Sequence, residues 1–234
     1  MIKRYSAITE GWEREIVLLQ GLPCVWGKCS FCDYIEDNCA DPSVCNKENK
    51  TVLEKVTGCY GALEVINSGS CFELPQETVE LIIEVAREKG IDTISFESHW
   101  LYHKRFNEWR ARFTNFNIVM KVGIETFDDD YRNTVLCKGG DFQTARDLET
   151  LVEHADSICL LVGIVGQSRE MIARDVEILT QNFSLGCINV FVENSSDFEE
   201  DVDLIAWFYT TYGHLEEYPD IDVLYHNEDF GVGA

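Results

Sequence analysis

Basic side chains are scarce in this chain. Of its 234 residues, 19 are lysine or arginine and 42 are aspartate or glutamate, which gives a formal net charge of −23 at pH 7. Proteins that hold long stretches of nucleic acid neutralise its phosphates with clustered basic residues. The charge balance therefore argues against a large nucleic-acid footprint, and we expect no nucleic-acid partner.

Long apolar runs are also missing. No run approaches the ~20 residues that a membrane-spanning helix needs, and the residues that follow Met1 do not form the apolar stretch of a secretory leader. We therefore expect a cytoplasmic protein with no membrane partner. In that reducing setting, the ten cysteines are expected to bind metal or to stay as buried free thiols, not to form disulfides.

Internal repeats, linkers and low-complexity tracts are absent, so we expect a single domain over residues 1–234. Short apolar runs alternate with amphipathic helical patterns, of which the clearest cover 78–86, 168–183 and 197–212, and a further helix is expected near 50–56. This order predicts an α/β fold in which helices cover a mostly parallel sheet. The expected strands are 16–19, 62–66, 93–96, 118–124, 158–165, 187–192 and 221–224.

The most informative pattern is a group of three cysteines just after the first apolar run. Cys24, Cys29 and Cys32 have the spacing C-x4-C-x2-C. Three thiolates close in sequence can hold three irons of a cubic iron–sulfur cluster. The fourth iron would then have no ligand in the motif and could bind a small molecule. We therefore predict a 4Fe-4S cluster at these residues.

A zinc site is the simplest alternative for these cysteines. Zinc usually takes four ligands, often as two separated pairs, and the sequence contains no second C-x2-C pair and no H-x3-H pattern. Cys39 or Cys45 could still supply a fourth ligand. A noncatalytic zinc or iron–sulfur binding module therefore stays open at this point.

Polar and small residues follow most of the expected strands. Ligands of parallel α/β folds bind at the carboxyl ends of the strands, so these residues are expected to share one mouth with the cysteines. The residues in question are Ser68, Gly69 and Ser70, then Glu97 and His99, then Glu125, and finally Glu193 and Asn194.

Several of these segments resemble those of radical S-adenosylmethionine enzymes. The resemblance covers most of the chain, although the usual cysteine spacing in these enzymes is C-x3-C-x2-C. It implies a partial (β/α)6-type TIM barrel, a 4Fe-4S cluster and S-adenosylmethionine as cofactors, and an electron donor such as flavodoxin or ferredoxin. The matching segments are the cysteine loop, Ser68-Gly69-Ser70-Cys71-Phe72, Phe96-Glu97-Ser98, Gly123-Ile124-Glu125-Thr126-Phe127-Asp128-Asp129, and Lys138-Gly139-Gly140 with Phe142.

The resemblance also implies roles for the residues at the mouth. Phe31 and Tyr34 would cover the adenine, and Glu125 would reach the ribose or the amino group. The methionine end would lie against Ser68, Gly69 and Ser70, where Gly69 would permit close backbone approach. Glu193 and Asn194 are placed with the cofactor, although their side chains could also bind substrate hydroxyls.

Within these enzymes, the chain looks like the queuine lyase group. That likeness implies a lyase that breaks a C–N bond of free queuine, by means of a 5′-deoxyadenosyl radical, and releases 7-aminomethyl-7-deazaguanine. Asp33, Glu97 and His99 are then the expected substrate ligands, with Glu97 and His99 also the expected catalytic residues. A glycyl-radical activase is a second possibility, but the Gly-Gly-Glu segment typical of such enzymes is missing.

Overall fold

Eight strands form one sheet in the simple order β1 to β8, in a computed structural model that describes residues 2–226 and 229–233. β1 pairs with β2 antiparallel, and each later strand pairs parallel with its neighbour. The strands are β1 Tyr5–Ile8, β2 Arg14–Leu19, β3 Ala62–Asn67, β4 Thr93–His99, β5 Asn117–Glu125, β6 Ser157–Val162, β7 Leu185–Val190 and β8 Ile221–Leu224. The predicted α/β half-barrel is confirmed.

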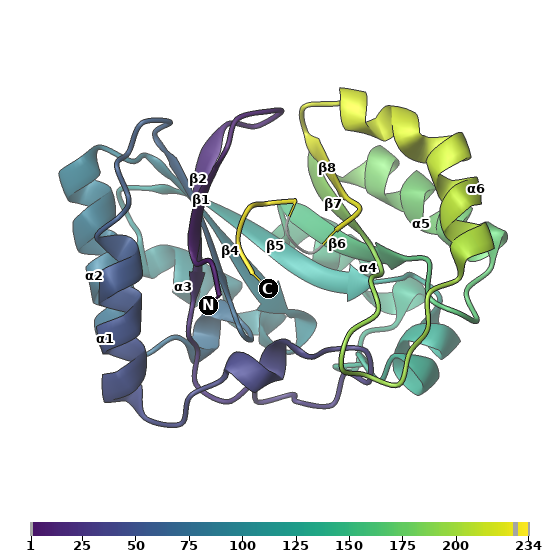
Figure 1. The fold of residues 1–234 in the computed structure, drawn as a ribbon, viewed down its shortest axis with the longest axis horizontal. Helices are drawn as coiled ribbons and strands as arrows, with labels where there is room; N and C mark the ends of the chain where they lie inside the picture. Colours follow the sequence, from purple (N-terminus) through teal and green to yellow (C-terminus); the bar gives the residue numbers. More distant parts are fainter. Residues whose placement is uncertain (1, 227–228, 234) are drawn as a thin grey trace.

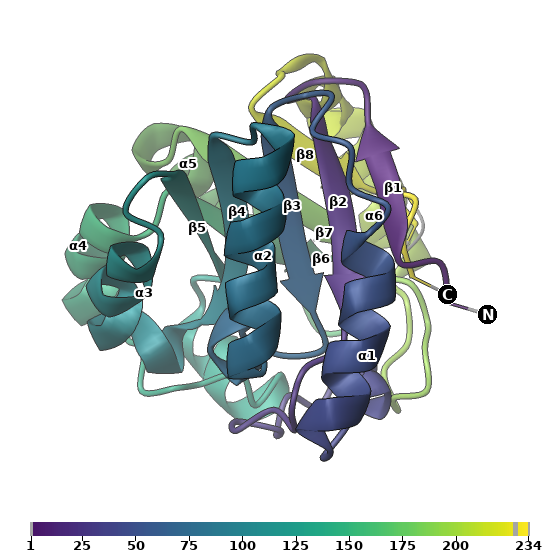
Figure 2. The same cartoon turned by 90° about the vertical axis from the view of Figure 1, so that its left-hand side faces the viewer.

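The helices lie on the outside of the curved sheet. Figure 1 shows the strands as an open arc with α2, α4, α5 and α6 around it, and Figure 2 shows α1 and α2 lying across its outer face. The inner, concave side is called the lumen below. The helices are α1 Pro42–Leu53, α2 Gln76–Lys89, α3 Phe106–Arg112, α4 Thr144–His154, α5 Arg169–Asn182 and α6 Val202–Tyr212.

Strand alternation divides the sheet into an apolar outer face and a more polar lumen. Val65, Phe96 and Met120 are fully buried in the main core beneath the helices. Their sequence neighbours Glu64 and Lys121 point the other way, into the lumen, and pair with each other there. Side chains on a strand alternate between the two faces, so apolar and charged residues one position apart serve different layers.

Buried ion pairs close the end of the lumen at which the parallel strands begin. Arg14 Nε lies 2.5 Å from Glu64, and Arg14 Nη2 lies 2.8 Å from Asp222. Burial by itself would raise the pKa of Glu64, but Lys121 and Arg14 hold it down at about 2. Arg14, Glu64 and Lys121 are at most 3% exposed, so this floor admits no ligand.

The structure differs from the predicted elements at several points, and α6, expected over 197–212, begins only at Val202. β4 continues through Glu97 and His99, which were expected to follow the strand. The antiparallel strand β1 was not predicted, because four half-buried residues give no clear pattern. A helix was expected near 50–56, whereas α1 begins at Pro42 with Asp41 as its N-cap. Within the described residues, no helix is long and apolar enough to cross a membrane.

Asp175 on α5 gives a testable prediction about stability. Its buried carboxylate accepts a hydrogen bond from Phe127 N at 2.7 Å, but Oδ2 has no partner among the described residues. Burial raises its pKa from 3.8 to about 7. Because the folded-state pKa lies above the unfolded value, stability is full below pH 4 and is lost as the pH rises towards 7.

We therefore expect the stability of Asp175→Asn relative to the wild type to rise between pH 5 and pH 8, by about 2.5 kcal/mol. Urea unfolding at both pH values measures this. Asp197→Asn, at an exposed loop position, is the control and should show no pH-dependent gain. Equal pH dependence of the wild type and Asp175→Asn would contradict the assignment.

Candidate active site

The cysteine loop follows β2 at the mouth of the lumen. Cys24, Cys29 and Cys32 are free and partly exposed. Gly27 N donates to Cys24 Sγ at 3.4 Å, and the backbone amides of Tyr34 and Ile35 donate towards Cys32. Burial raises the pKa of Cys29 to about 12, while Lys138 acts in the opposite direction. The loop therefore supplies N–H groups and a cation to sulfurs that burial alone would keep protonated.

This environment fits an iron–sulfur cluster better than a single ion. Within residues 2–226 and 229–233, no three His, Cys, Asp or Glu side chains converge on one point as the ligands of a single metal ion would. A cubic cluster takes one thiolate per iron, so its cysteine sulfurs stay apart. Hydrogen bonds and positive charge stabilise such thiolates. The residues present fit a 4Fe-4S cluster.

Cys39 and Cys45 lie together, next to the cysteine loop. Cys45 Sγ donates to Cys39 O at 3.4 Å, and burial followed by a hydrogen bond with Cys39 raises its pKa to about 11. Cys39 N in turn bonds to Gly21 O at 3.0 Å, so these residues pack beneath the loop. They therefore bond to the backbone and to each other, which weakens the zinc alternative.

Ser68, Gly69 and Ser70 follow β3 and touch the cysteine loop directly. Ser68 Oγ accepts a hydrogen bond from Gly21 N at 3.1 Å, and Ser70 Oγ lies 3.0 Å from Ser98 Oγ. A Cβ at Gly69 would lie 3.5 Å from Cys24 Cβ and would collide with Glu73 Oε2. Glycine is thus needed here because Glu73 packs against it, and the predicted close approach of the cofactor to Gly69 stays a prediction.

Glu73 connects the segment after β3 with the cysteine loop, and it was not identified as a site residue from the sequence. Its carboxylate accepts hydrogen bonds from Ser70 N at 2.5 Å, Val25 N at 2.9 Å and the hydroxyl of Tyr102 at 2.9 Å. It thereby ties the segment after β3 to the cysteine loop. The Ser-x-x-Glu spacing of Ser70 and Glu73 is the pattern of a capping box, so a signal was present in the sequence.

Glu125 and Lys138 form a buried ion pair beside the cysteines. Lys138 Nζ lies 2.7 Å from Glu125 Oε1 and 5.9 Å from the centre of the Phe31 ring. Burial would lower the pKa of Lys138, but Glu125 and then Cys29 raise it, so the ammonium stays charged. Glu125 has φ +66°, and the sheet register shifts at this point. Such strain in a non-glycine residue commonly marks a functional site.

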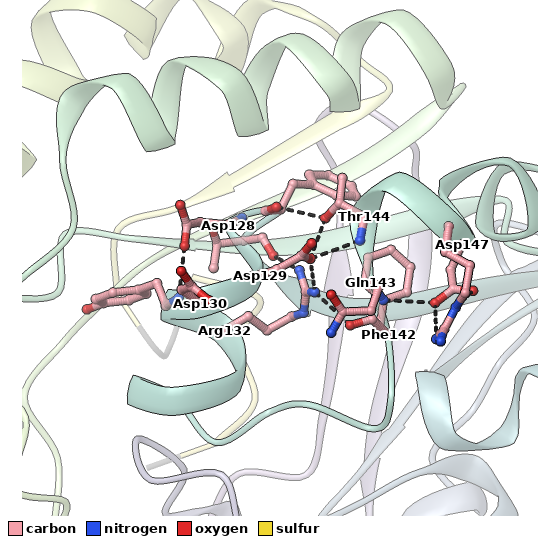
Figure 3. Close-up of polar contacts among 12 residues, drawn as sticks. Asp128, Asp129, Asp130, Arg132, Phe142, Gln143, Thr144 and Asp147 are labelled. Atoms are coloured by element: carbon pink, nitrogen blue, oxygen red, sulfur yellow. Dashed lines mark hydrogen bonds and ion pairs between the residues drawn. The ribbon is translucent and has the colours of Figure 1, made fainter.

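A hydrogen-bonded network holds the chain between Glu125 and Lys138, as Figure 3 shows. Arg132 is 1% exposed and donates to Thr126 O at 2.8 Å and to Phe142 O at 3.0 Å. Its guanidinium also pairs with Asp129, which accepts from Thr144 N at 2.9 Å. These acidic and basic residues therefore fix the loop that presents Lys138 and do not themselves reach the mouth cysteines.

Glu97 points into the lumen above the ion-paired floor. Its carboxylate lies 4.0 Å from Lys121 Nζ and 3.7 Å from Cys159 Sγ, and its side chain is 34% exposed. Burial raises its pKa, an effect that Lys121 partly offsets. The phenol of Tyr34 is close enough for Glu97 to raise the pKa of the tyrosine, after burial. Glu97 and Tyr34 therefore lie near each other, but Tyr34 is 52% exposed.

His99 has both ring nitrogens engaged by the backbone. Nδ1 accepts from Leu101 N at 3.0 Å, and Nε2 donates to Lys138 O at 2.9 Å. Burial, then Lys138, lowers its pKa to about 3, and its ring stacks on Trp26. A neutral imidazole with no free nitrogen cannot transfer protons or bind substrate through them. These contacts favour a positioning role for His99, and its predicted catalytic and substrate-binding roles stay predictions.

The remaining predicted residues occupy the edge of the mouth. Asn194 Nδ2 donates to Phe31 O at 3.0 Å, which joins the segment after β7 to the cysteine loop. Asp33 is partly buried, and burial raises its pKa. Glu193 is exposed and accepts from Glu200 N at 3.4 Å, so its side chain is turned towards a neighbouring loop. The position of Glu193 gives no support to its predicted contact with the cofactor.

Comparisons with solved structures match the whole chain. A queuine lyase from Clostridium spiroforme, bound to SAM and queuine, is 49% identical, with a TM-score of 0.96 over 100% of both chains. A radical SAM methyltransferase from Sphaerobacter thermophilus is 14% identical, with a TM-score of 0.60 over 92% of this chain and 67% of its own. Streptococcus suis SuiB bound to S-adenosylmethionine is 14% identical, with a TM-score of 0.55 over 92% and 47%. No family model and no curated protein matches.

The shared half-barrel and the position of the cysteine loop at its mouth put the protein in the radical S-adenosylmethionine class. Identity of 49% over the full length of both chains goes further, and the chain belongs to the queuine lyase family.

Proposed function

We propose that this protein is a radical S-adenosylmethionine lyase that cleaves the C–N bond of free queuine and releases 7-aminomethyl-7-deazaguanine. The observation that carries the proposal is the full-length match, at 49% identity, to a queuine lyase bound to SAM and queuine. The net charge of −23 agrees with a substrate that carries no phosphate backbone.

Cys24, Cys29 and Cys32 are the residues that would hold a 4Fe-4S cluster. The chemistry supplied when the cluster and S-adenosylmethionine are bound is one-electron cleavage of the sulfonium, which starts hydrogen abstraction from the substrate. Lys138 is the cation beside the cysteines. It pairs with Glu125 at 2.7 Å and can also bind an anionic group at the mouth. Glu73 keeps the cysteine loop and the segment after β3 in register.

Glu97 is the residue we assign to the substrate. It lies deeper in the lumen than the cysteines, because β4 runs on to His99 before reaching the mouth. A carboxylate accepts hydrogen bonds from the N–H groups on the edge of a guanine-like base. Tyr34 lies near Glu97 but is 52% exposed, and it stays a candidate for covering the adenine. Asp33 stays a candidate for the hydroxyls of the cyclopentene ring.

Two other functions have less support. A glycyl-radical activase would need a surface for a protein substrate, whereas Glu97 and Lys121 lie within the lumen. A noncatalytic module would not need a charged residue held inside a half-barrel. As the external electron donor we propose a small redox protein such as flavodoxin or ferredoxin.

The direct test is turnover by anaerobically reconstituted protein with S-adenosylmethionine, a low-potential reductant and queuine. We expect 5′-deoxyadenosine and 7-aminomethyl-7-deazaguanine by mass spectrometry, both dependent on queuine. The control omits queuine and should give only slow release of 5′-deoxyadenosine. If that slow rate does not change with queuine and no deazaguanine product forms, the lyase proposal is wrong.

A further inference from the structure

Residues 229–233 turn back from the sheet into the lumen. In Figure 1 this segment follows β8 and runs on the concave side, towards the N-terminus. Near its start, Asp229 Oδ2 accepts hydrogen bonds from Tyr225 N at 2.7 Å and His226 N at 2.8 Å. At its end, Lys3 and Gly233 exchange two backbone hydrogen bonds of 3.2 and 2.8 Å. The segment thus crosses between the β8 edge and the β1 edge, which the sheet leaves open.

Apolar packing holds this segment firmly in place. Val232 is 4% exposed and packs with Ile16, Leu18 and Ile66. Gly231 has φ +71°, and a Cβ there would collide with Ser6 Oγ of β1. Close backbone approach of this kind is possible only for glycine. The chain on either side of Phe230 is therefore fixed.

The ring of Phe230 lies next to the proposed substrate residue. Its centre is 5.3 Å from the guanidinium carbon of Arg14 and 5.5 Å from Lys121 Nζ. The same Lys121 ammonium lies 4.0 Å from Glu97. Phe230 is only partly buried, so part of its ring is left uncovered by the floor and by Val232.

We propose that Phe230 is a specificity-determining residue, whose ring forms one wall of the substrate site and packs against the flat base of the substrate. This rests on the proposed function, because Glu97 locates the base. Glu97 supplies the in-plane hydrogen-bond acceptor, and Phe230 supplies an apolar face beside it. A flat heteroaromatic ring gains from both, since aromatic stacking and edge hydrogen bonds act in different directions. Recognition of the base thus depends on a segment that follows the last strand.

Three substitutions at one position separate stacking from general packing. Phe230→Tyr keeps the flat ring and should stay within about two-fold of the wild-type KM for queuine. Phe230→Leu and Phe230→Ala remove it and should raise that KM about ten-fold. The KM for S-adenosylmethionine and the cluster absorbance should not change in any of the three. Gly231→Val, which detaches the segment from Ser6, should raise the KM for queuine in the same way.

Phe116→Leu is the matched control, because Phe116 is also partly buried but packs on the outer core next to Phe113. Its KM for queuine should equal that of the wild type. A KM for queuine in Phe230→Leu within about two-fold of the wild type would overturn the role of the ring, while the lyase function would stand. If the wild-type protein fails to turn over queuine, both proposals fall.

Discussion

Replacing any one of Cys24, Cys29 and Cys32 by alanine abolishes iron binding after anaerobic reconstitution, and with it all turnover. The expectation follows from the loop around these residues, in which backbone N–H groups and Lys138 face sulfurs that burial would otherwise keep protonated. In a cluster of this kind each thiolate would hold its own iron, so none could replace another. Iron content and the EPR spectrum of the reduced protein, with and without S-adenosylmethionine, measure the effect.

Cys59→Ala is the control for this experiment, because Cys59 is exposed and lies outside the cysteine loop. It should bind about four irons per chain, as the wild type does. Full iron incorporation by all three loop variants would show that these cysteines do not hold a cluster. Stoichiometric zinc in place of iron, with no EPR signal on reduction, would favour the noncatalytic module.

Glu97→Gln should lower kcat/KM for queuine about ten-fold or more, because a neutral amide cannot accept from two N–H donors as a carboxylate does. Cluster binding and the slow cleavage of S-adenosylmethionine without substrate should persist, since Glu97 lies away from the cysteine loop on β4. Steady-state kinetics with product detection by mass spectrometry provide the measurement.

The matched control is Glu84→Gln, at an exposed position on α2 outside the sheet, and it should behave as the wild type. If Glu97→Gln loses the cleavage of S-adenosylmethionine without substrate as strongly as it loses kcat/KM for queuine, the carboxylate serves the cofactor instead. An unchanged kcat/KM for queuine would show that Glu97 does not bind the substrate.

The sequence predicts the positions of residues that directly follow a strand. It does not predict the positions of residues that a long loop returns to the mouth of the lumen. The cysteines, Ser68 and Glu125 were expected at the mouth because strand ends in a parallel sheet meet at one edge. Lys138 lies thirteen residues after Glu125, and its place depends on Arg132, on Asp129 and on the positive φ angles of Glu125 and Cys137. No local pattern encodes such a path.

His99 shows a second limit of sequence reasoning. Its position at the end of β4 was predicted, but its role depends on which groups meet its two nitrogens. Those groups are the backbone of Leu101 and of Lys138, 39 residues away. Phe230 is a similar case, because its neighbours Arg14 and Lys121 come from β2 and β5.

The ion-paired floor closes the end of the lumen opposite the mouth. Lys121 precedes Glu125 by four residues of β5, which places the floor about 13 Å below the mouth. Whatever sits at Glu97 must pass the cysteines on the way in and again on the way out. When two ligands enter from the same mouth, the one that binds deeper has to bind first and leave last. If S-adenosylmethionine binds at the cysteine loop and queuine at Glu97, we expect queuine to bind first and S-adenosylmethionine second.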